Sequence, residues 1–176
     1  MRIALVTGGA RAGKSRWAQR EALALGGDDV GVVATAEPLD DEMADRIARH
    51  RAERPSGWAT IEEPLDVAAA VAACAHSVVV LDCLTVWMSN LLHQPPSDLA
   101  AASDRALEAV ERLLAAADRR PDGDLIVVTN EVGMGLVPGD ALSRAYRDTL
   151  GRANARVAAR AERVVLLVAG LPVTVR

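Results

Sequence analysis

Short apolar runs alternate along the chain with longer stretches in which apolar residues recur every three or four positions. The runs are rich in Val, Ile and Leu and predict strands at residues 2–7, 29–35, 77–82, 124–129 and 164–169, with shorter candidates at 58–62 and 172–175. Because the main runs are continuous rather than alternating, we expect strands that are buried on both faces. This pattern is typical of a parallel sheet covered by helices.

The longer stretches predict amphipathic helices between those strands. One stripe of apolar residues runs from Leu99 to Ala117, and a second runs from Leu142 to Val157. Residues at this spacing lie on one face of a helix, so both stripes are expected to pack on the sheet. Proline- and glycine-containing segments between the elements indicate loops within one domain that covers residues 1–176.

Composition then narrows the classes of function. The chain has 176 residues, of which 51% are hydrophobic and 25% charged. A chain of this length and composition can bury a hydrophobic core without disulfides or metals. A net charge of -4 disfavours a general nucleic-acid or membrane-surface binder. No uncharged apolar run reaches about 18 residues, so no integral membrane segment is expected. Cys74 and Cys83, and an N-terminal segment without a signal-peptide core, favour reduced thiols in a cytoplasmic protein.

A phosphate-binding motif follows the first predicted strand. Residues 8–15, GGARAGKS, match the pattern G-x-x-x-x-G-K-[ST] between a strand and a helical segment. In such a loop, backbone N–H groups surround phosphate oxygens, Lys14 neutralises the β and γ phosphates, and Ser15 ligates Mg²⁺. Lys14 is also the only lysine among 20 basic residues. We therefore expect an α/β P-loop NTPase fold of the RecA-like type, with a mainly parallel central sheet, and eight nucleotide-binding residues in this loop: Gly8, Gly9, Ala10, Arg11, Ala12, Gly13, Lys14 and Ser15.

Two other strand ends carry polar residues that belong at the same edge of such a sheet. Asp82 ends the run VVVLD and is a candidate magnesium ligand, although the N-cap of a following helix is the alternative role for its carboxylate. Asn130 and Glu131 follow the strand predicted at 124–129. Glu131 either orients a nucleophile, contacts metal or caps a polar loop, and the sequence leaves its role open.

One histidine lies in an unusual setting. The segment DRIARHRAERP places Arg46 and Arg54 one helical turn before and after His50. A helix is predicted here from an N-cap at Asp40 or Asp41 to a stop at Pro55, with Met43, Ile47 and His50 on one face. Neighbouring guanidinium groups disfavour protonation of an imidazole, and a neutral imidazole is a nucleophile. The alternative is an ordinary surface or hydrogen-bonded histidine.

Taken together, these motifs resemble the bifunctional adenosylcobinamide kinase / adenosylcobinamide-phosphate guanylyltransferase family of cobalamin synthesis. The resemblance runs nearly end to end, through TGGARAGKS, ATAEPLDDEMADRIARHRAERP, LDCLTVWMSNLL, NEVGMGLVP and VVLLVAGLP. It implies a kinase that acts on adenosylcobinamide with ATP or GTP. It further implies transfer of GMP from GTP to the resulting phosphate through a covalent GMP-histidine.

The resemblance also assigns roles to residues. The family motif I-x-x-H-R-x-x-R-P places the nucleophile on His50. The second catalytic residue that we expect is Lys14, from the P-loop motif. The Mg²⁺ cofactor held by Ser15 and Asp82 is expected from the P-loop and strand-end motifs. The resemblance implies a homotrimer. Ala12 stands where the family usually has Ser, which removes a hydroxyl contact but leaves the backbone N–H groups. Nucleotide-binding residues outside the P-loop are carried over as Ala34, Thr35, Ala36, Arg51, Ala52, Glu53, Arg54, Glu62 and Asp82.

Three other classes of P-loop protein fit the rest of this sequence less well. A regulatory GTP switch with an Asn-Lys-x-Asp base reader is excluded because the single lysine lies in the P-loop. An acidic, aromatic-poor chain disfavours a motor that tracks a nucleic-acid strand. A simple small-metabolite kinase would leave the arginine cluster around His50 without a role.

Overall fold

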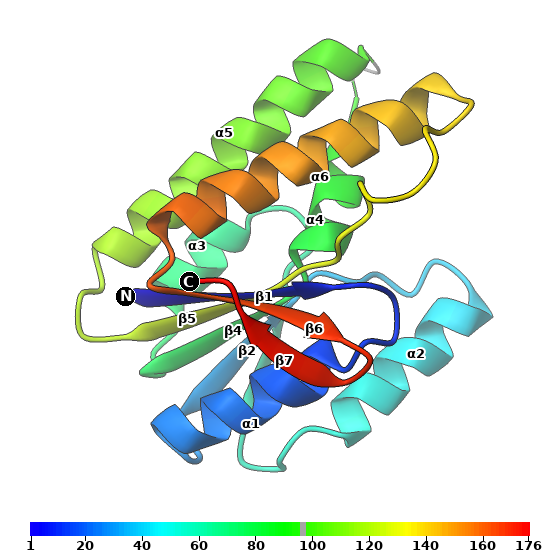
Figure 1. The fold of residues 1–176 in the computed structure, drawn as a ribbon. Helices are drawn as coiled ribbons and strands as arrows, with labels where there is room; N and C mark the ends of the chain where they lie inside the picture. The colour runs from blue at the N-terminus through cyan, green and yellow to red at the C-terminus, as the bar shows by residue number, and fades with distance from the viewer. Residues whose placement is uncertain (96–97) are drawn as a thin grey trace.

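The computed structural model describes residues 1–95 and 98–176, which form an α/β fold around one seven-stranded sheet (Figure 1). The strand order is β3-β2-β4-β5-β1-β6-β7, with parallel pairing from β3 to β6 and an antiparallel β7 at the edge. The strands are β1 (Arg2–Gly8), β2 (Val30–Ala34), β3 (Ala59–Glu62), β4 (Val78–Asp82), β5 (Asp124–Val128), β6 (Arg163–Val168) and β7 (Leu171–Thr174).

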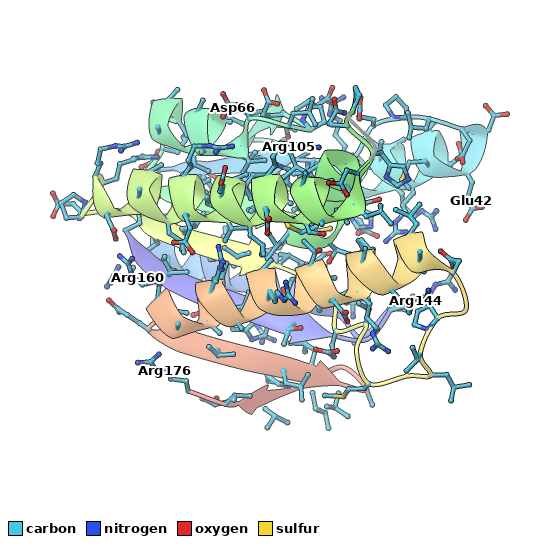
Figure 2. All side chains as sticks on the ribbon, turned by 90° about the horizontal axis from the view of Figure 1, so that it is seen from above. Glu42, Asp66, Arg105, Arg144, Arg160 and Arg176 are labelled. Carbon is cyan, nitrogen blue, oxygen red and sulfur yellow. The ribbon has the colours of Figure 1, made fainter. Side chains whose placement is uncertain are left out.

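Helices cover both faces of this sheet, as the buried strand runs predict. They are α1 (Lys14–Gly26), α2 (Asp41–Ala52), α3 (Val67–Ala73), α4 (Leu84–Leu92), α5 (Leu99–Asp118) and α6 (Ala141–Arg160). Residues of α3, α4, α5 and α6 pack into one hydrophobic cluster, whereas α1 packs into a second cluster on the opposite face. Figure 2 shows α5 and α6 lying side by side across the first face. The expected α/β class is therefore confirmed.

The predicted elements agree with the structure to within a few residues at their ends. Every expected strand is present, and Asp40 caps α2 by accepting a hydrogen bond of 2.7 Å from the Met43 N–H. The helix ends at Ala52 rather than running to Pro55. Arg54 precedes that proline, and a residue in this position is disfavoured in the α conformation. Within the described residues, no helix is long and apolar enough to span a bilayer.

Strand register brings the candidate site together. Ala34 at the end of β2 pairs with Asp82 on β4, and Asp82 pairs with Val128 on β5. Val128 in turn pairs with Val6 on β1, two residues before the P-loop begins. Because all four strands are parallel, their carboxyl ends meet at one edge, which is where open α/β sheets bind ligands.

Candidate functional site

The P-loop is a tight turn locked against the sheet. Gly8 has a φ of +147°, and a Cβ at this position would lie 2.5 Å from the carbonyl oxygen of Leu167 on the neighbouring strand. Gly13, with a φ of +94°, precedes the first residue of α1. Both positions favour glycine because an L side chain rarely adopts such φ values. The motif glycines therefore set the path of the loop into the N-terminus of α1, a position whose backbone N–H groups favour an anion.

Lys14 opens α1 and is held inside the loop. Its Nζ donates a hydrogen bond of 2.6 Å to the Gly9 carbonyl, and only 8% of the residue is exposed. Burial, the largest effect, lowers the pKa of Lys14, and Arg46 acts in the same direction while Cys83 and Asp82 oppose it. The Gly9 carbonyl thus holds the ammonium at a loop of the kind whose backbone N–H groups surround an anion.

A small pocket lies between the start of α1 and the end of β4. Ser15 and Asp82 both line it, together with Arg54 and Trp58. Among the described residues, no group of three or more His, Cys, Asp or Glu side chains is arranged to hold a metal alone. Magnesium in nucleotide sites does not need one, because it keeps waters and phosphate oxygens and takes one or two protein ligands. The Ser15 hydroxyl and the Asp82 carboxylate fit that limited requirement.

A larger pocket separates α2 from the sheet edge. Its empty volume, open solvent included, is about 600 Å³. Met43, Ile47 and His50 line it from α2, so the predicted common face of this helix points into the pocket. The remaining lining residues are Ala34, Ala36, Arg46, Arg51, Arg54, Thr60, Glu62, Asp82, Cys83 and Val86.

Asp82 connects the histidine to the rest of the site. Its Oδ2 lies 3.6 Å from Nδ1 of His50 and 3.3 Å from a terminal nitrogen of Arg54. Arg54 also donates a hydrogen bond of 3.2 Å to the Thr60 hydroxyl. Burial alone would raise the pKa of the Asp82 carboxyl, but His50 and Arg54 outweigh burial and hold it below its ordinary value. The carboxylate is therefore ionised and has two cationic or hydrogen-bonding partners from the α2 side.

The cysteine after Asp82 is held in place through Thr35. The Thr35 hydroxyl donates to the Cys83 carbonyl at 2.9 Å and accepts from the Cys83 N–H at 3.0 Å. Asn90 donates a bond of 2.8 Å to the Thr35 carbonyl. Burial raises the pKa of the Cys83 thiol to about 11, with Asp82 adding to the effect, so the thiol stays protonated at neutral pH. In this arrangement the Thr35 hydroxyl is occupied, and Ala34 and Ala36 line the pocket beside it.

The residues carried over by resemblance do not all reach the pocket. Arg51 does, and it forms a 3.0 Å ion pair with Glu62 at the surface. Ala52 ends α2 and Glu53 caps it, and both are exposed outside the pocket lining. Arg46, which the resemblance did not carry over, lines the pocket instead.

The structure bears on the roles that the sequence leaves open for Asp82 and Glu131. The N-cap hypothesis for Asp82 is wrong, because Asp82 is the last residue of β4 and Cys83 occupies the cap position of α4. The Glu131 carboxylate accepts a hydrogen bond from the Gly133 N–H, as a loop cap does, and its roles toward a nucleophile or a metal stay predictions. The Glu131 N–H donates to the Gly8 carbonyl at 3.1 Å, which ties this loop to the P-loop.

Sequence reasoning missed the contact between Asp82 and His50. It considered only the arginines as neighbours of the imidazole, and it named Arg54 as a nucleotide-binding residue. The structure places the Arg54 guanidinium, with 8% of its side chain exposed, against Asp82 and Thr60. Asp82 and Arg54 lie 28 positions apart, so no local sequence pattern reports the pair.

Comparison with known proteins gives a consistent result. A family model described as cobinamide kinase / cobinamide phosphate guanyltransferase matches residues 4–175. The bifunctional adenosylcobalamin biosynthesis protein CobP of Pseudomonas aeruginosa is 43% identical over 175 residues, covering 98% of this chain and 96% of that protein. The CobU proteins of Salmonella typhimurium and Escherichia coli, which carry the same description, are each 42% identical over 180 residues, covering 98% of both chains. The nearly full-length family match and these relatives show that the chain belongs to the cobinamide kinase / cobinamide phosphate guanyltransferase family.

Proposed function

We propose that this protein is a bifunctional enzyme of cobalamin biosynthesis. It phosphorylates adenosylcobinamide with ATP or GTP and then transfers GMP from GTP to adenosylcobinamide phosphate, with release of pyrophosphate. Family membership supports both reactions. The observation that carries the proposal is that one carboxylate, Asp82, faces both the Ser15 pocket beside the P-loop and the pocket that contains His50. A phosphate-binding loop and a candidate nucleophile thus share one sheet edge.

In the kinase reaction, the P-loop positions the triphosphate. Backbone N–H groups of residues 8–15 surround the phosphates, and Lys14 neutralises charge that develops on the transferred phosphoryl group. Ser15 and Asp82 would hold Mg²⁺, which when bound would neutralise part of the triphosphate charge. The acceptor is the cobinamide side-chain hydroxyl, whose oxygen attacks the γ phosphorus while the P–O bond to the departing nucleoside diphosphate breaks. The hydroxyl proton is released to solvent.

In the nucleotidyl-transfer reaction, His50 is the nucleophile. Its Nε2 attacks the α phosphorus of GTP, an N–P bond forms, and the P–O bond to pyrophosphate breaks. A phosphate oxygen of adenosylcobinamide phosphate then attacks the same phosphorus, and the N–P electron pair returns to the imidazole. Arg46 and Arg51 line the pocket at positions suited to the triphosphate charge.

We infer the remaining properties from family resemblance alone. They are a homotrimeric assembly, a cytoplasmic location and one domain that carries both activities. Light scattering on the purified protein tests the assembly, and a mass other than that of three chains would contradict it.

Labelling with GTP carrying ³²P at the α position tests the nucleophile. After incubation with Mg²⁺, we expect an acid-labile GMP adduct that maps to the peptide containing His50. His50→Ala should lose this adduct and keep cobinamide phosphorylation, because the P-loop is untouched. His93→Ala, a histidine exposed at the end of α4, is the matched control and should label normally. Adduct on another residue, or loss of both activities in folded His50→Ala, would contradict the assignment.

A further inference from the structure

We propose that Asp82 is a positioning residue for His50 in nucleotidyl transfer, and that Arg54 and Thr60 hold Asp82 for this purpose. The inference rests on the proposed role of His50 as nucleophile. Asp82 would then have two roles, as a magnesium ligand and as the partner of His50. The same carboxylate would therefore take part in both reactions.

The geometry selects one nitrogen of the imidazole. Nδ1 of His50 lies 3.6 Å from Oδ2 of Asp82, in a pocket open to the ligand. A carboxylate facing Nδ1 favours the tautomer that carries its proton there, because an ionised carboxylate only accepts hydrogen bonds. Nε2 then keeps its lone pair free for the α phosphorus. The separation exceeds an ordinary N–H···O hydrogen bond, and such contacts between catalytic groups are often long before substrate binds.

The same contact matters once the N–P bond forms. The proton remains on Nδ1 throughout, so the guanylylated ring becomes a cation when pyrophosphate leaves. That positive charge develops opposite the Asp82 carboxylate, which stabilises it. When the acceptor phosphate attacks, the N–P bond breaks and the ring returns to neutral with its Nδ1 proton in place. Neither half of the reaction needs another proton carrier at this nitrogen.

Asp82 is itself held rigidly, as a positioning residue requires. Arg54 contacts the same Oδ2 at 3.3 Å and the Thr60 hydroxyl at 3.2 Å. The Asp82 and Arg54 side chains are 17% and 8% exposed, so water competes little for the contact. By contrast, α2 has no buried residue of its own. The Asp82 carboxylate at the end of β4 is therefore held in place more firmly than the His50 imidazole on α2, and it can orient that imidazole.

Nitrogen NMR of the His50 ring separates positioning from magnesium binding. Spectra of ¹⁵N-histidine-labelled protein are recorded at alkaline pH without nucleotide or metal, so the magnesium role of Asp82 does not contribute. Wild-type protein should show the Nδ1–H tautomer at His50, and Asp82→Asn should shift the ring toward the Nε2–H tautomer. Asp29→Asn is the matched control, because Asp29 pairs with Nδ1 of His76 at 3.0 Å outside the site. It should change the His76 signals and leave those of His50 unchanged.

The kinetic readout is the rate of enzyme–GMP formation at saturating GTP, measured by rapid quench. Asp82→Asn should lower this rate by about 10- to 100-fold, by analogy with loss of the partner that orients a metal-ligating histidine. Asp82→Glu, which keeps the carboxylate, should recover part of the loss. Arg54→Gln tests the same link with the carboxylate intact and should give a smaller decrease, which keeps the test valid if an Asp82 variant unfolds.

Each outcome decides the inference. A slower rate together with an altered tautomer supports positioning. A slower rate with an unchanged tautomer, or an unchanged rate, overturns the positioning role. Magnesium binding would then be the only role proposed for Asp82. If wild-type protein forms no adduct on His50, the proposed nucleophile fails and this inference fails with it.

Discussion

Helices α1 and α2 approach the same sheet edge but are held there in opposite ways. Four residues of α1 are buried, including Lys14 and Trp17, whereas α2 buries none. Lys14 is 8% exposed, while the His50 side chain is 31% exposed. Burial of one large apolar side chain stabilises by about 1.5–3 kcal/mol, so the packing of α1 outweighs a few polar contacts. The P-loop and α1 are thus anchored in the hydrophobic core, whereas α2, which carries His50, lies on the surface of that core.

This difference indicates how the two reactions depend on the fold. The P-loop is defined by backbone geometry and by the packing of α1. We therefore expect substitutions that alter this backbone or packing to impair its function. The α2 half depends on contacts that converge on Asp82 and on the surface pair between Arg51 and Glu62. Segments with few buried contacts open locally at low free energy. We therefore expect α2 to exchange its backbone amides faster than α1.

The largest effect is expected from Lys14→Ala. Removing the ammonium leaves the triphosphate without its fixed point charge, so the phosphorylation rate should fall by about 10²- to 10³-fold, as on loss of a fixed transition-state donor. Steady-state kinetics of cobinamide phosphorylation measure this. Arg16→Ala removes an exposed basic residue two positions later in α1 and serves as the control. An unchanged phosphorylation rate in folded Lys14→Ala would remove the P-loop from the kinase reaction.

Gly8→Ala tests the rigidity of the P-loop half. The new Cβ would meet the Leu167 carbonyl oxygen at 2.5 Å, and this backbone atom belongs to a buried strand pair that cannot easily move. Overpacking of this kind costs about 1–3 kcal/mol of unfolding free energy. Urea denaturation measures it, with Gly139→Ala as the control because a Cβ there meets nothing within 4 Å. Equal stability of the two variants would contradict a P-loop locked against β6.

The same contrast separates what the sequence could predict from what it could not. Continuous apolar runs record burial directly, so the strands were predicted to within a few residues, and a helix was expected after the P-loop motif. The role of Arg54 was not, because its partner depends on how α2 docks against β4 rather than on neighbours in the chain. The arginines around His50 look equivalent in the sequence, yet Arg54 is buried against Asp82 while Arg51 pairs with Glu62 at the surface. Polar contacts between distant elements leave no periodic pattern.

The smallest effect is expected from Arg51→Ala, and it sharpens the comparison within α2. The Arg51 and Glu62 side chains are 59% and 58% exposed, and exposed ion pairs contribute about 0.2–1 kcal/mol. The unfolding free energy should therefore change by less than about 1 kcal/mol, and this difference should shrink further as salt screens the pair. Hydrogen exchange should show slightly faster exchange in α2 and none of this change in α1. We expect Arg54→Gln, which removes the buried contact to Asp82, to speed exchange in α2 more than Arg51→Ala does. Equal effects of the two variants would contradict a helix held to the sheet mainly by the Asp82 contact.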